Sequence, residues 1–407
     1  MLKVSDLSFS YGHEPLYENV NFAIARGQKV GLVGPNGSGK STLLKMLTGG
    51  EDGYSGKIIV DGSISLVPQE VKYDPTMESS ATARDYIDPN NDHEDYEIQK
   101  LLSGLELNIE LSVNPQKFSG GQKTKLAIAR ALLVNPDILF LDEPTNFMDL
   151  AGKKWVMQFL GNYKGTVIII SHDLPLLDHA IDKILAVNPA TKTIDEYKGN
   201  YTNYLKLRAE REELLRKEIQ VRQQHIARME KGLKKMARAN RFTGAKIKQI
   251  HRIEKAKEEL PQMPKELQKF KIKLPEPARV GELVLKVVNV SKLFGDRIVL
   301  KDVNCSILRG ERIAIIGENG AGKSTFIKIL MQILEPDSGS MSRNDQLKVG
   351  YYSQEFETFA EGNGFNKTVV ETFEDQTKKD QGFARGFLGR FMFSEDKVFQ
   401  KIESLSG

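Results

Sequence analysis

The chain has 407 residues, more than one ordinary hydrophobic core holds, so two or more domains are expected. Hydrophobic residues make up 40% and charged residues 28%, and the aliphatic runs, such as Val167–Ile170, are far shorter than the ~20 residues of a membrane span, which excludes an integral membrane protein. The single cysteine, Cys305, excludes intrachain disulfides and cysteine-cluster metal sites, and the strand-like N-terminus lacks an apolar signal core, so a cytoplasmic protein is expected.

A phosphate-binding loop follows the first predicted buried strand. Residues Gly34–Ser41 fit the P-loop pattern G-x-x-x-x-G-K-[S/T], between a strand expected at Lys29–Val33 and a helix expected at Ser41–Leu47. Its glycines let backbone N–H groups turn toward phosphates, and the helix N-terminus adds positive potential. Lys40 is expected to reach the β- and γ-phosphates of ATP, and Ser41 to ligate Mg²⁺. The predicted nucleotide-binding residues here are Gly34, Asn36, Gly37, Ser38, Gly39, Lys40, Ser41 and Thr42.

Two further polar segments follow along the chain. A strand expected at residues 64–68 ends at Gln69, whose amide could contact Mg²⁺ or the attacking water. A helix is expected at Lys123–Leu133, and the residues before it form a second N-terminus able to bind an anion. Its predicted nucleotide-binding residues are Ser119, Gly120, Gly121 and Gln122. Two phosphate-binding ends in one domain suggest that they serve different nucleotides.

The next two strands carry the predicted hydrolytic groups. A buried strand over residues 137–141 ends in Asp142 and Glu143. Asp142 is expected in the Mg²⁺ shell, and Glu143 is expected to orient or deprotonate the attacking water. His172 follows the strand expected at Thr166–Ile170, so it can approach the γ-phosphate. Glu143, His172 and Gln69 are the predicted catalytic residues.

Positive charge is concentrated in the middle of the chain. The formal net charge is +4, but Tyr201–Val280 holds 22 basic and 10 acidic residues. Such a density of like charge repels itself, and an anionic partner would relieve the repulsion. A solvated helix pair without such a partner stays an alternative. The basic residues expected to meet phosphates are Arg222, Arg228, Lys231, Lys234, Lys235, Arg238, Arg241, Lys246, Lys248 and Arg252.

Apolar spacing in this basic segment predicts two helices. One carries an apolar seam at spacings of 7, 3, 4 and 3, formed by Ile219, Ile226, Met229, Leu233 and Met236. A second helix is expected from Ala245 to about Leu260, with Ile247, Ile250 and Ile253 facing inward. A turn-like tip is expected at Ala239–Gly244, and four prolines after the second helix predict an extended exit.

The chain then repeats its beginning. Gly317–Thr325 repeats the first P-loop 283 residues later, and a strand–loop–helix unit is expected over Arg312–Leu330. Phe294 matches Tyr11 at the same offset, so the domain is duplicated. In the second copy, Lys323 is expected to bind the phosphates as Lys40 does in the first. Ser324 and Gln354 are expected to ligate Mg²⁺ there, as Ser41 and Gln69 do in the first copy. The predicted nucleotide-binding residues of the second copy are Gly317, Asn319, Gly320, Ala321, Gly322, Lys323, Ser324, Thr325, Gln354, Ser406 and Gly407.

The expected fold class is α/β, with two P-loop NTPase domains joined by a basic helical hairpin. Residues 1–197 form the first domain, residues 198–280 the linker, and residues 281–407 the N-terminal part of the second domain. The second copy stops halfway through the pattern of the first, so the chain is expected to be incomplete at its C-terminus.

These motifs together resemble the ATP-binding cassette superfamily, in which the signature of one cassette closes over the ATP held by the other. The resemblance implies an ATPase that binds two ATP molecules with Mg²⁺. Tyr11 and Phe294 are similar to the aromatics that stack on adenine in that family, although a role in the core stays open for both.

Within the superfamily, Leu141–Asn146, Tyr197–Tyr204 and the basic linker resemble the ABC-F family, whose linker is the P-site tRNA interaction motif. The resemblance implies a translation factor similar to the energy-dependent translational throttle proteins. Such a protein binds the ribosomal E site in its ATP-closed state, contacts P-site tRNA and rRNA, and is released by hydrolysis. It implies a monomer that closes its own cassettes and has no membrane partner.

The chain departs from the ABC-F pattern at three places. Phe147 and Met148 replace the usual His-Leu, Phe118 replaces Leu at the first signature, and little room is left for an arm subdomain after Gln69. The ATPase subunit of a transporter and a non-catalytic RNA-binding protein stay alternatives. Antibiotic resistance by ribosome protection also stays open, and the short linker tip favours a housekeeping role in translation.

Overall fold

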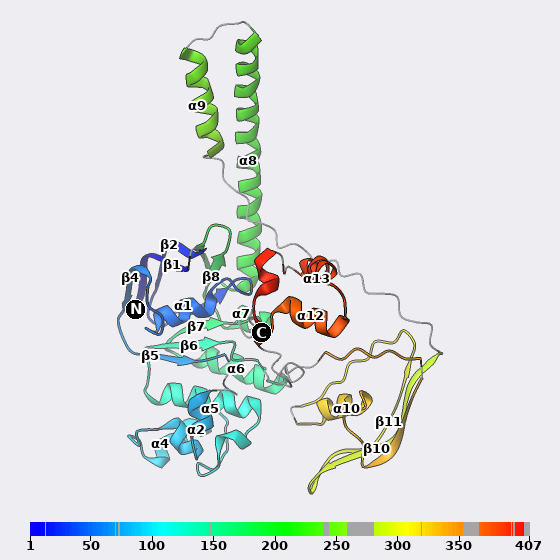
Figure 1. The fold of residues 1–407 in the computed structure, drawn as a ribbon. Helices are drawn as coiled ribbons and strands as arrows, with labels where there is room; N and C mark the ends of the chain where they lie inside the picture. The colour runs from blue at the N-terminus through cyan, green and yellow to red at the C-terminus, as the bar shows by residue number, and fades with distance from the viewer. Residues whose placement is uncertain are drawn as a thin grey trace. The chain divides into compact units, whose positions relative to one another are not determined.

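The structure is a computed structural model that divides into two compact units, Met1–Glu266 and Leu267–Gly407 (Figure 1). The described residues are 1–12, 14–69, 71, 74–146, 148–238, 244–258, 281–318, 320–344, 346–352, 366–391, 393 and 395–402.

A six-stranded sheet forms the centre of the first unit. Its order is β5-β6-β7-β3-β8-β9, parallel except for β9, which runs antiparallel to β8. The strands are β3 (Lys29–Val33), β5 (Ile64–Val67), β6 (Ile138–Asp142), β7 (Thr166–Ile170), β8 (Lys183–Asn188) and β9 (Thr193–Lys198). The strands predicted before the P-loop, Gln69, the carboxylate pair and His172 are all present. Because these strands are parallel, those four polar segments leave the sheet at one edge.

Both faces of this sheet are buried, because successive side chains of a strand point to opposite faces. Leu139 and Leu141 of β6 belong to one apolar cluster, and Ile138 and Phe140 belong to another. The second cluster also contains the inner side chains of α1 (Lys40–Leu47) and of an antiparallel sheet ordered β2-β1-β4. That sheet consists of β1 (Leu2–Tyr11), β2 (Glu14–Ile24) and β4 (Ser55–Val60).

Six helices supply half of the buried side chains of the other cluster. They are α2 (Pro75–Ser79), α3 (Ala83–Ile87), α4 (Asp95–Gly104), α5 (Gly120–Leu133), α6 (Leu150–Asn162) and α7 (Leu174–His179). The predicted helix at Lys123–Leu133 begins earlier, at Gly120, because Ser119 caps it.

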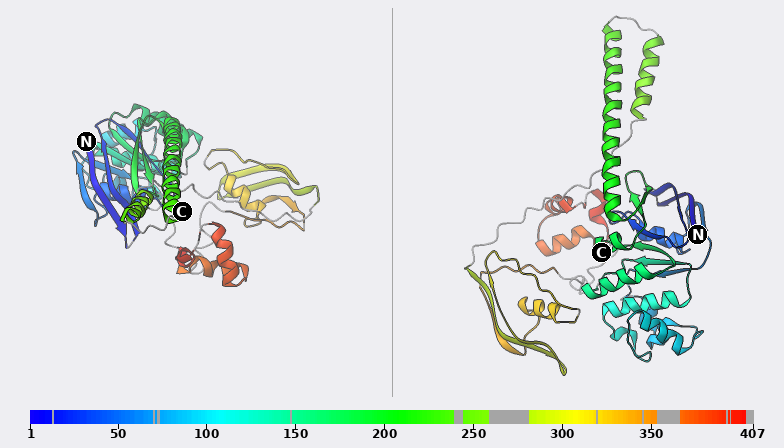
Figure 2. Two further views of the ribbon diagram at one scale, coloured as in Figure 1. Left: turned by 90° about the horizontal axis from the view of Figure 1, so that it is seen from above. Right: turned by 180° about the vertical axis from the view of Figure 1, so that it is seen from behind.

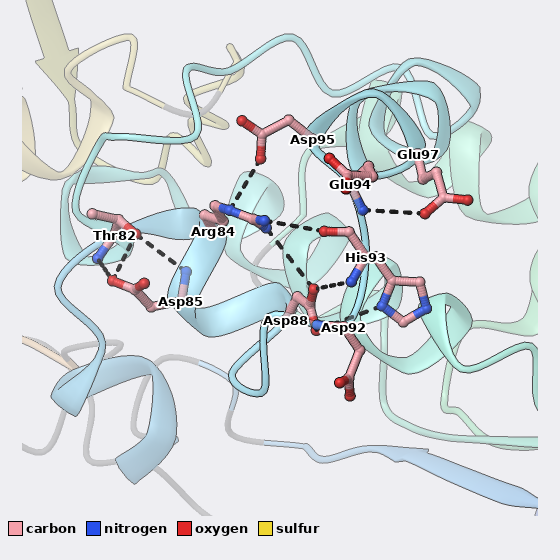
Figure 3. A network of polar contacts seen from close by, with 9 residues as sticks. All are labelled: Thr82, Arg84, Asp85, Asp88, Asp92, His93, Glu94, Asp95 and Glu97. Atoms are coloured by element: carbon pink, nitrogen blue, oxygen red, sulfur yellow. Dashed lines mark hydrogen bonds and ion pairs between the residues drawn. The ribbon is translucent and has the colours of Figure 1, made fainter.

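A polar network fixes the loop between α3 and α4 (Figure 3). The buried carboxylate of Asp88 accepts the backbone N–H groups of Asp92 and His93 at 3.2 and 2.8 Å. Burial favours a raised pKa for Asp88, but these N–H groups outweigh it and hold the pKa below its ordinary value. Arg84 lies 3.0 Å from Asp95 and donates to the carbonyl of His93 at 3.0 Å. The loop is therefore held from both helices.

The basic segment forms the predicted helical hairpin, with α8 (Tyr201–Arg238) beside α9 (Gly244–Glu258) in Figures 1 and 2. Ile226 and Ile253 are buried in it, as predicted. The inward orientation predicted for Ile247 and Ile250 is wrong, since their exposed fractions are 55% and 36%. A two-helix contact covers only a narrow stripe, so apolar residues at its edge stay in solvent. No helix among the described residues is both long and apolar enough to cross a bilayer.

Polar contacts attach the base of α8 to α7 and β9 of the first unit. The backbone N–H and the hydroxyl of Thr202 donate to the two carboxylate oxygens of Asp178, on α7, at 2.7 and 2.8 Å. Asn203 donates its N–H to the side chain of Asn200 at 3.0 Å. Farther along the helix, Arg211 pairs with Asp195 of β9 at 3.0 Å. Side chains of α7 and β9 thus fix the start of the hairpin.

The second unit contains an antiparallel sheet ordered β11-β10-β12 and several helices. Its elements are β10 (Leu283–Phe294), β11 (Arg297–Leu308), α10 (Lys323–Leu330), β12 (Ser338–Arg343), α12 (Val369–Thr377), α13 (Gln381–Leu388), η4 (Gly389–Phe391) and η5 (Glu395–Phe399).

One strand predicted in this unit is wrong: Arg312–Ile316 pairs with no strand among the described residues, and 83% of Ile316 is exposed. In the first unit the matching strand, β3, lies between β7 and β8. Among the described residues of the second unit, no strand lies beside this segment as β7 and β8 lie beside β3.

Candidate active site

The first P-loop has the conformation that its glycines predict. Gly37 and Gly39 have φ of 74° and 90°, a region where residues with a Cβ are strained. Gly39 precedes α1, so the first N–H groups of the helix face the loop. The ammonium of Lys40 donates to the carbonyls of Gly34 and Pro35, each at 3.0 Å. Burial lowers the pKa of Lys40, while Glu143 and Asp142 oppose that change. The loop can therefore hold an anion with backbone N–H groups and one cation.

The predicted Mg²⁺ ligands Ser41 and Asp142 meet. The Ser41 hydroxyl donates to Oδ2 of Asp142 at 3.0 Å, which joins the start of α1 to the end of β6. Burial raises the pKa of Asp142, as does Glu143, while the Ser41 hydrogen bond and Lys40 oppose the rise. The other oxygen of Asp142 is buried without a hydrogen-bond partner in the described part of the chain. A hydroxyl and a carboxylate with a free oxygen are donors that Mg²⁺ prefers, so these residues fit the ion.

Glu143 and His172 also lie together. The backbone N–H of His172 donates to Oε2 of Glu143 at 3.2 Å, and its ring Nε2 lies 3.2 Å from Oε1. Glu143 has a φ of 49° and donates its N–H to the carbonyl of Ile170 at 2.9 Å. A turn with positive φ thus aims this buried carboxylate at the edge where the P-loop lies. The His172 side chain is 62% exposed and accessible to a nucleotide.

Sequence reasoning missed the residues that hold His172 in place. Asp173 accepts the N–H of Leu176 at 3.3 Å as the N-cap of α7, and it pairs with Lys153 of α6 at 2.8 Å. The capping signal, an Asp directly before an apolar turn, was available in the sequence. The pairing with Lys153 depends on how α6 packs in the folded chain, and no pattern in the sequence indicates it.

The remaining predicted residues of the first site are accessible. Gln69 is exposed just after β5, at the edge of the sheet that carries the cluster above. Its contact with Mg²⁺ or water stays a prediction. Tyr11 is 55% exposed and packs edge-on against Phe9, with ring centroids 4.9 Å apart. Its stacking on adenine stays a prediction, and its exposure leaves the ring accessible.

The first signature forms a reciprocal cap. Ser119 accepts the N–H of Gln122 at 3.4 Å, and Gln122 accepts the N–H of Ser119 at 3.0 Å. Ser119 and Gly120 are exposed. The predicted helix N-terminus is present, and the role of Gln122 could have been found from the S-x-x-Q capping pattern.

The second P-loop repeats the local geometry of the first. Gly320 and Gly322 have φ of 82° and 88°, and Lys323 donates to the carbonyls of Gly317 and Glu318 at 2.8 and 2.7 Å. Phe294 is 52% exposed. The predicted residues Asn319, Gln354, Ser406 and Gly407, as well as Phe147 and residues 239–243 of the linker tip, lie outside the described residues.

Comparison with known proteins decides the family. The sequence pattern described as ABC transporter matches residues 17–146 and 300–407, which include both P-loops. The chain belongs to the ATP-binding cassette family. A second pattern with the same description matches residues 190–272, which include the hairpin.

Individual relatives align over the whole chain. It is 30% identical to the ATP-binding protein YdiF of Bacillus subtilis, of which it covers 69%. It is 31% identical to the ATP-binding protein YheS of Escherichia coli K12, covering 68%, and 29% identical to the ribosome protection protein VmlR of B. subtilis, covering 74%. The predicted α/β fold with tandem cassettes and the predicted ATPase activity are confirmed at the level of the family, and the relatives agree with the resemblance to ABC-F proteins.

Proposed function

We propose that this ATPase binds ribosomes when its cassettes hold ATP, that its basic hairpin contacts tRNA and rRNA, and that hydrolysis releases it. The observation that carries the proposal is the hairpin itself, which extends from an ATP-binding cassette and presents basic side chains to solvent. Residues 1–197, 198–280 and 281–407 are the proposed cassette, linker and second cassette.

The proposed chemistry at the first site uses the geometry above. The P-loop N–H groups and Lys40 bind the phosphates, and Tyr11 stacks on adenine. Ser41 and Asp142 would hold Mg²⁺, which when bound would neutralise charge on the phosphate oxygens. Glu143 orients the attacking water and accepts its proton, and His172 positions that carboxylate beside the γ-phosphate. Gln69 is proposed to contact Mg²⁺ or the attacking water, and the signature residues Ser119–Gln122 are proposed to bind the ATP held by the second cassette.

The electrostatics of the hairpin favour a nucleic-acid partner. The exposed residues Arg228 and Lys231 lie on α8, and Lys248 and Arg252 lie on α9. Among the described residues, no ion pair satisfies these four side chains, whereas Lys257 pairs with Glu230 at 2.7 Å. Free cations on paired helices bind phosphates without reading sequence. This argues for a polyanion over a basic or apolar protein surface.

One relative supports the ribosome as that polyanion. VmlR is named a ribosome protection protein, and the chain covers 74% of it. The E site and P-site tRNA as the place of binding, a monomer with intramolecular closure, a cytoplasmic location and a role in translation or in antibiotic resistance all belong to this proposal.

Sedimentation with purified ribosomes tests it. The Glu143→Gln variant should retain ATP, because it keeps the P-loop but lacks the carboxylate that activates water, and it should pellet with ribosomes only when ATP is present. The pelleted fraction should fall steeply between two salt concentrations. Failure to pellet while ATP still binds would contradict the proposal and favour the ATPase subunit of a membrane transporter.

A matched pair of fourfold variants locates the contact. Neutralising the four exposed hairpin cations to Gln should reduce the slope of log affinity against log salt by up to about 3–4, at roughly 0.7–0.9 per phosphate contact. The control neutralises four exposed lysines of the cassette and should leave the slope unchanged. The hairpin set is Arg228, Lys231, Lys248 and Arg252, and the control set is Lys3, Lys57, Lys100 and Lys164. Equal slopes in both variants would show that the hairpin does not touch RNA.

A further inference from the structure

A buried tyrosine lies beneath the first P-loop. Tyr17, on β2, is fully buried in the cluster between the two sheets. Its hydroxyl donates to the backbone carbonyl of Ser38 at 3.3 Å. Burial raises the pKa of this hydroxyl well above its ordinary value, so the group is a neutral donor under all working conditions.

That hydrogen bond acts on the part of the loop that meets phosphate. The carbonyl of Ser38 and the N–H of Gly39 belong to one planar trans peptide, so they point in opposite directions. A hydroxyl that holds the carbonyl toward the core therefore turns the Gly39 N–H away from the core. P-loop N–H groups cradle phosphates on that side.

Side chains packed beneath the loop restrict the position of the Ser38–Gly39 peptide. A Cβ on Gly39 would lie 2.7 Å from Leu16 Cδ2 and 3.0 Å from the Tyr17 hydroxyl, so the backbone packs directly on these two side chains. The Ser38 residue is buried, and its own hydroxyl has no hydrogen-bond partner among the described residues. Among the described residues, the Tyr17 hydroxyl is the side-chain donor that contacts this peptide.

The second cassette has the same packing without the hydroxyl. At the repeat offset, Tyr17 corresponds to Leu300, and Gly39 corresponds to Gly322. A Cβ on Gly322 would lie 2.8 Å from Val299 Cγ1 and 3.1 Å from Leu300 Cδ2, which confirms the correspondence in space. Leucine cannot donate to the P-loop carbonyl, so the two loops are supported differently.

We propose that Tyr17 is a positioning residue for the first nucleotide site: its hydroxyl holds the Ser38–Gly39 peptide so that the Gly39 N–H faces the nucleotide phosphates. The second site has Leu300 in place of Tyr17 and lacks this hydroxyl. The inference rests on the proposed assignment of the P-loop as the phosphate site, and it makes the two ATP sites of the chain unequal.

Equilibrium titration with MgATP and MgADP tests the proposal. All variants are made in the 407-residue chain carrying Lys323→Ala, so that the first site is measured alone. Tyr17→Phe should raise the Kd of both nucleotides by about three- to tenfold, the effect of one buried hydrogen bond. Tyr17→Leu, which installs the residue of the second cassette, should bind no better than Tyr17→Phe. The nucleotide-free unfolding temperature is recorded for each variant.

Tyr86→Phe is the matched control. Tyr86 is also buried, and its hydroxyl donates to Asp74 at 3.0 Å, away from the P-loop. Its loss should lower the unfolding temperature and leave both Kd values unchanged. An unchanged Kd in Tyr17→Phe with a raised Kd only in Tyr17→Leu would overturn the proposal, because the ring and not the hydroxyl would then matter. Equal Kd changes in Tyr17→Phe and Tyr86→Phe would overturn it too.

A further arm separates this inference from the site assignment. Lys40→Ala should abolish nucleotide binding in the same background. If Lys40→Ala binds normally, the P-loop assignment itself fails. If Lys40→Ala abolishes binding while Tyr17→Phe binds as the parent chain does, only the role of Tyr17 fails.

Discussion

Removing the carboxylate of Asp178 should loosen the base of the hairpin. Asp178 accepts two hydrogen bonds from Thr202 at the first turn of α8, at 2.7 and 2.8 Å. Loss of a helix N-terminal acceptor costs about 0.5–2 kcal/mol, and the charge at the positive end of the helix adds roughly 0.3–1 kcal/mol. Asp178 is partly exposed, so we expect a local destabilisation of about 1–2 kcal/mol for Asp178→Ala.

Hydrogen exchange of the first turn of α8 measures this effect. A loss of 1–2 kcal/mol corresponds to exchange about 5–30 times faster at the N–H of Thr202 and its neighbours. Glu213→Gln, which removes an exposed pair with Lys217 on the same helix, should leave these amides unchanged. Unchanged exchange in Asp178→Ala would refute the reasoning, because the carboxylate would then not hold the helix.

Two other predictions concern the site and the hairpin. Asp142→Asn should stabilise the nucleotide-free chain by about 1 kcal/mol in thermal unfolding, because it removes a buried charge that is repelled by Glu143. The same variant should bind MgATP more weakly. A lower unfolding temperature would contradict the repulsion between the two carboxylates. Ile253→Ala should destabilise the hairpin by about 2 kcal/mol and speed proteolysis of α9, whereas Ile247→Ala, at a site 55% exposed, should not. Equal proteolysis rates would show that Ile253 does not anchor α9.

The parts of the site that follow strands were predictable from the sequence. The P-loop, Asp142, Glu143 and His172 lie in short motifs behind strongly apolar runs, and parallel strands bring the ends of such runs to one edge. The contact between Ser41 and Asp142 follows from that geometry alone. The short motifs therefore sufficed to predict which side chains meet at this edge of the sheet.

Other features depend on partners distant in sequence. Tyr17 reads as one apolar residue of a strand, and only the fold places its hydroxyl on Ser38. The run Arg312–Ile316 has the composition of a buried strand, but a strand needs neighbours to pair with, and none lies among the described residues. Ile247 follows helical spacing, although the partner helix is too narrow to cover it. For Arg312–Ile316 and Ile247 the local pattern fits the predicted element, and the neighbouring elements decide whether the residues are buried.

The short helix α7 connects the proposed ATP site to the long helix α8. His172 and Asp173 lie at its start, and Asp178, near its end, holds α8. Six residues of helix span about 9 Å, so a displacement of about 1 Å at the start would rotate α7 by roughly 6°. The 38 residues of α8 span about 57 Å, and the same rotation carried along it would move the far end by about 6 Å. A small displacement of α7 at the γ-phosphate side of the proposed site would therefore produce a several-fold larger displacement at the far end of α8.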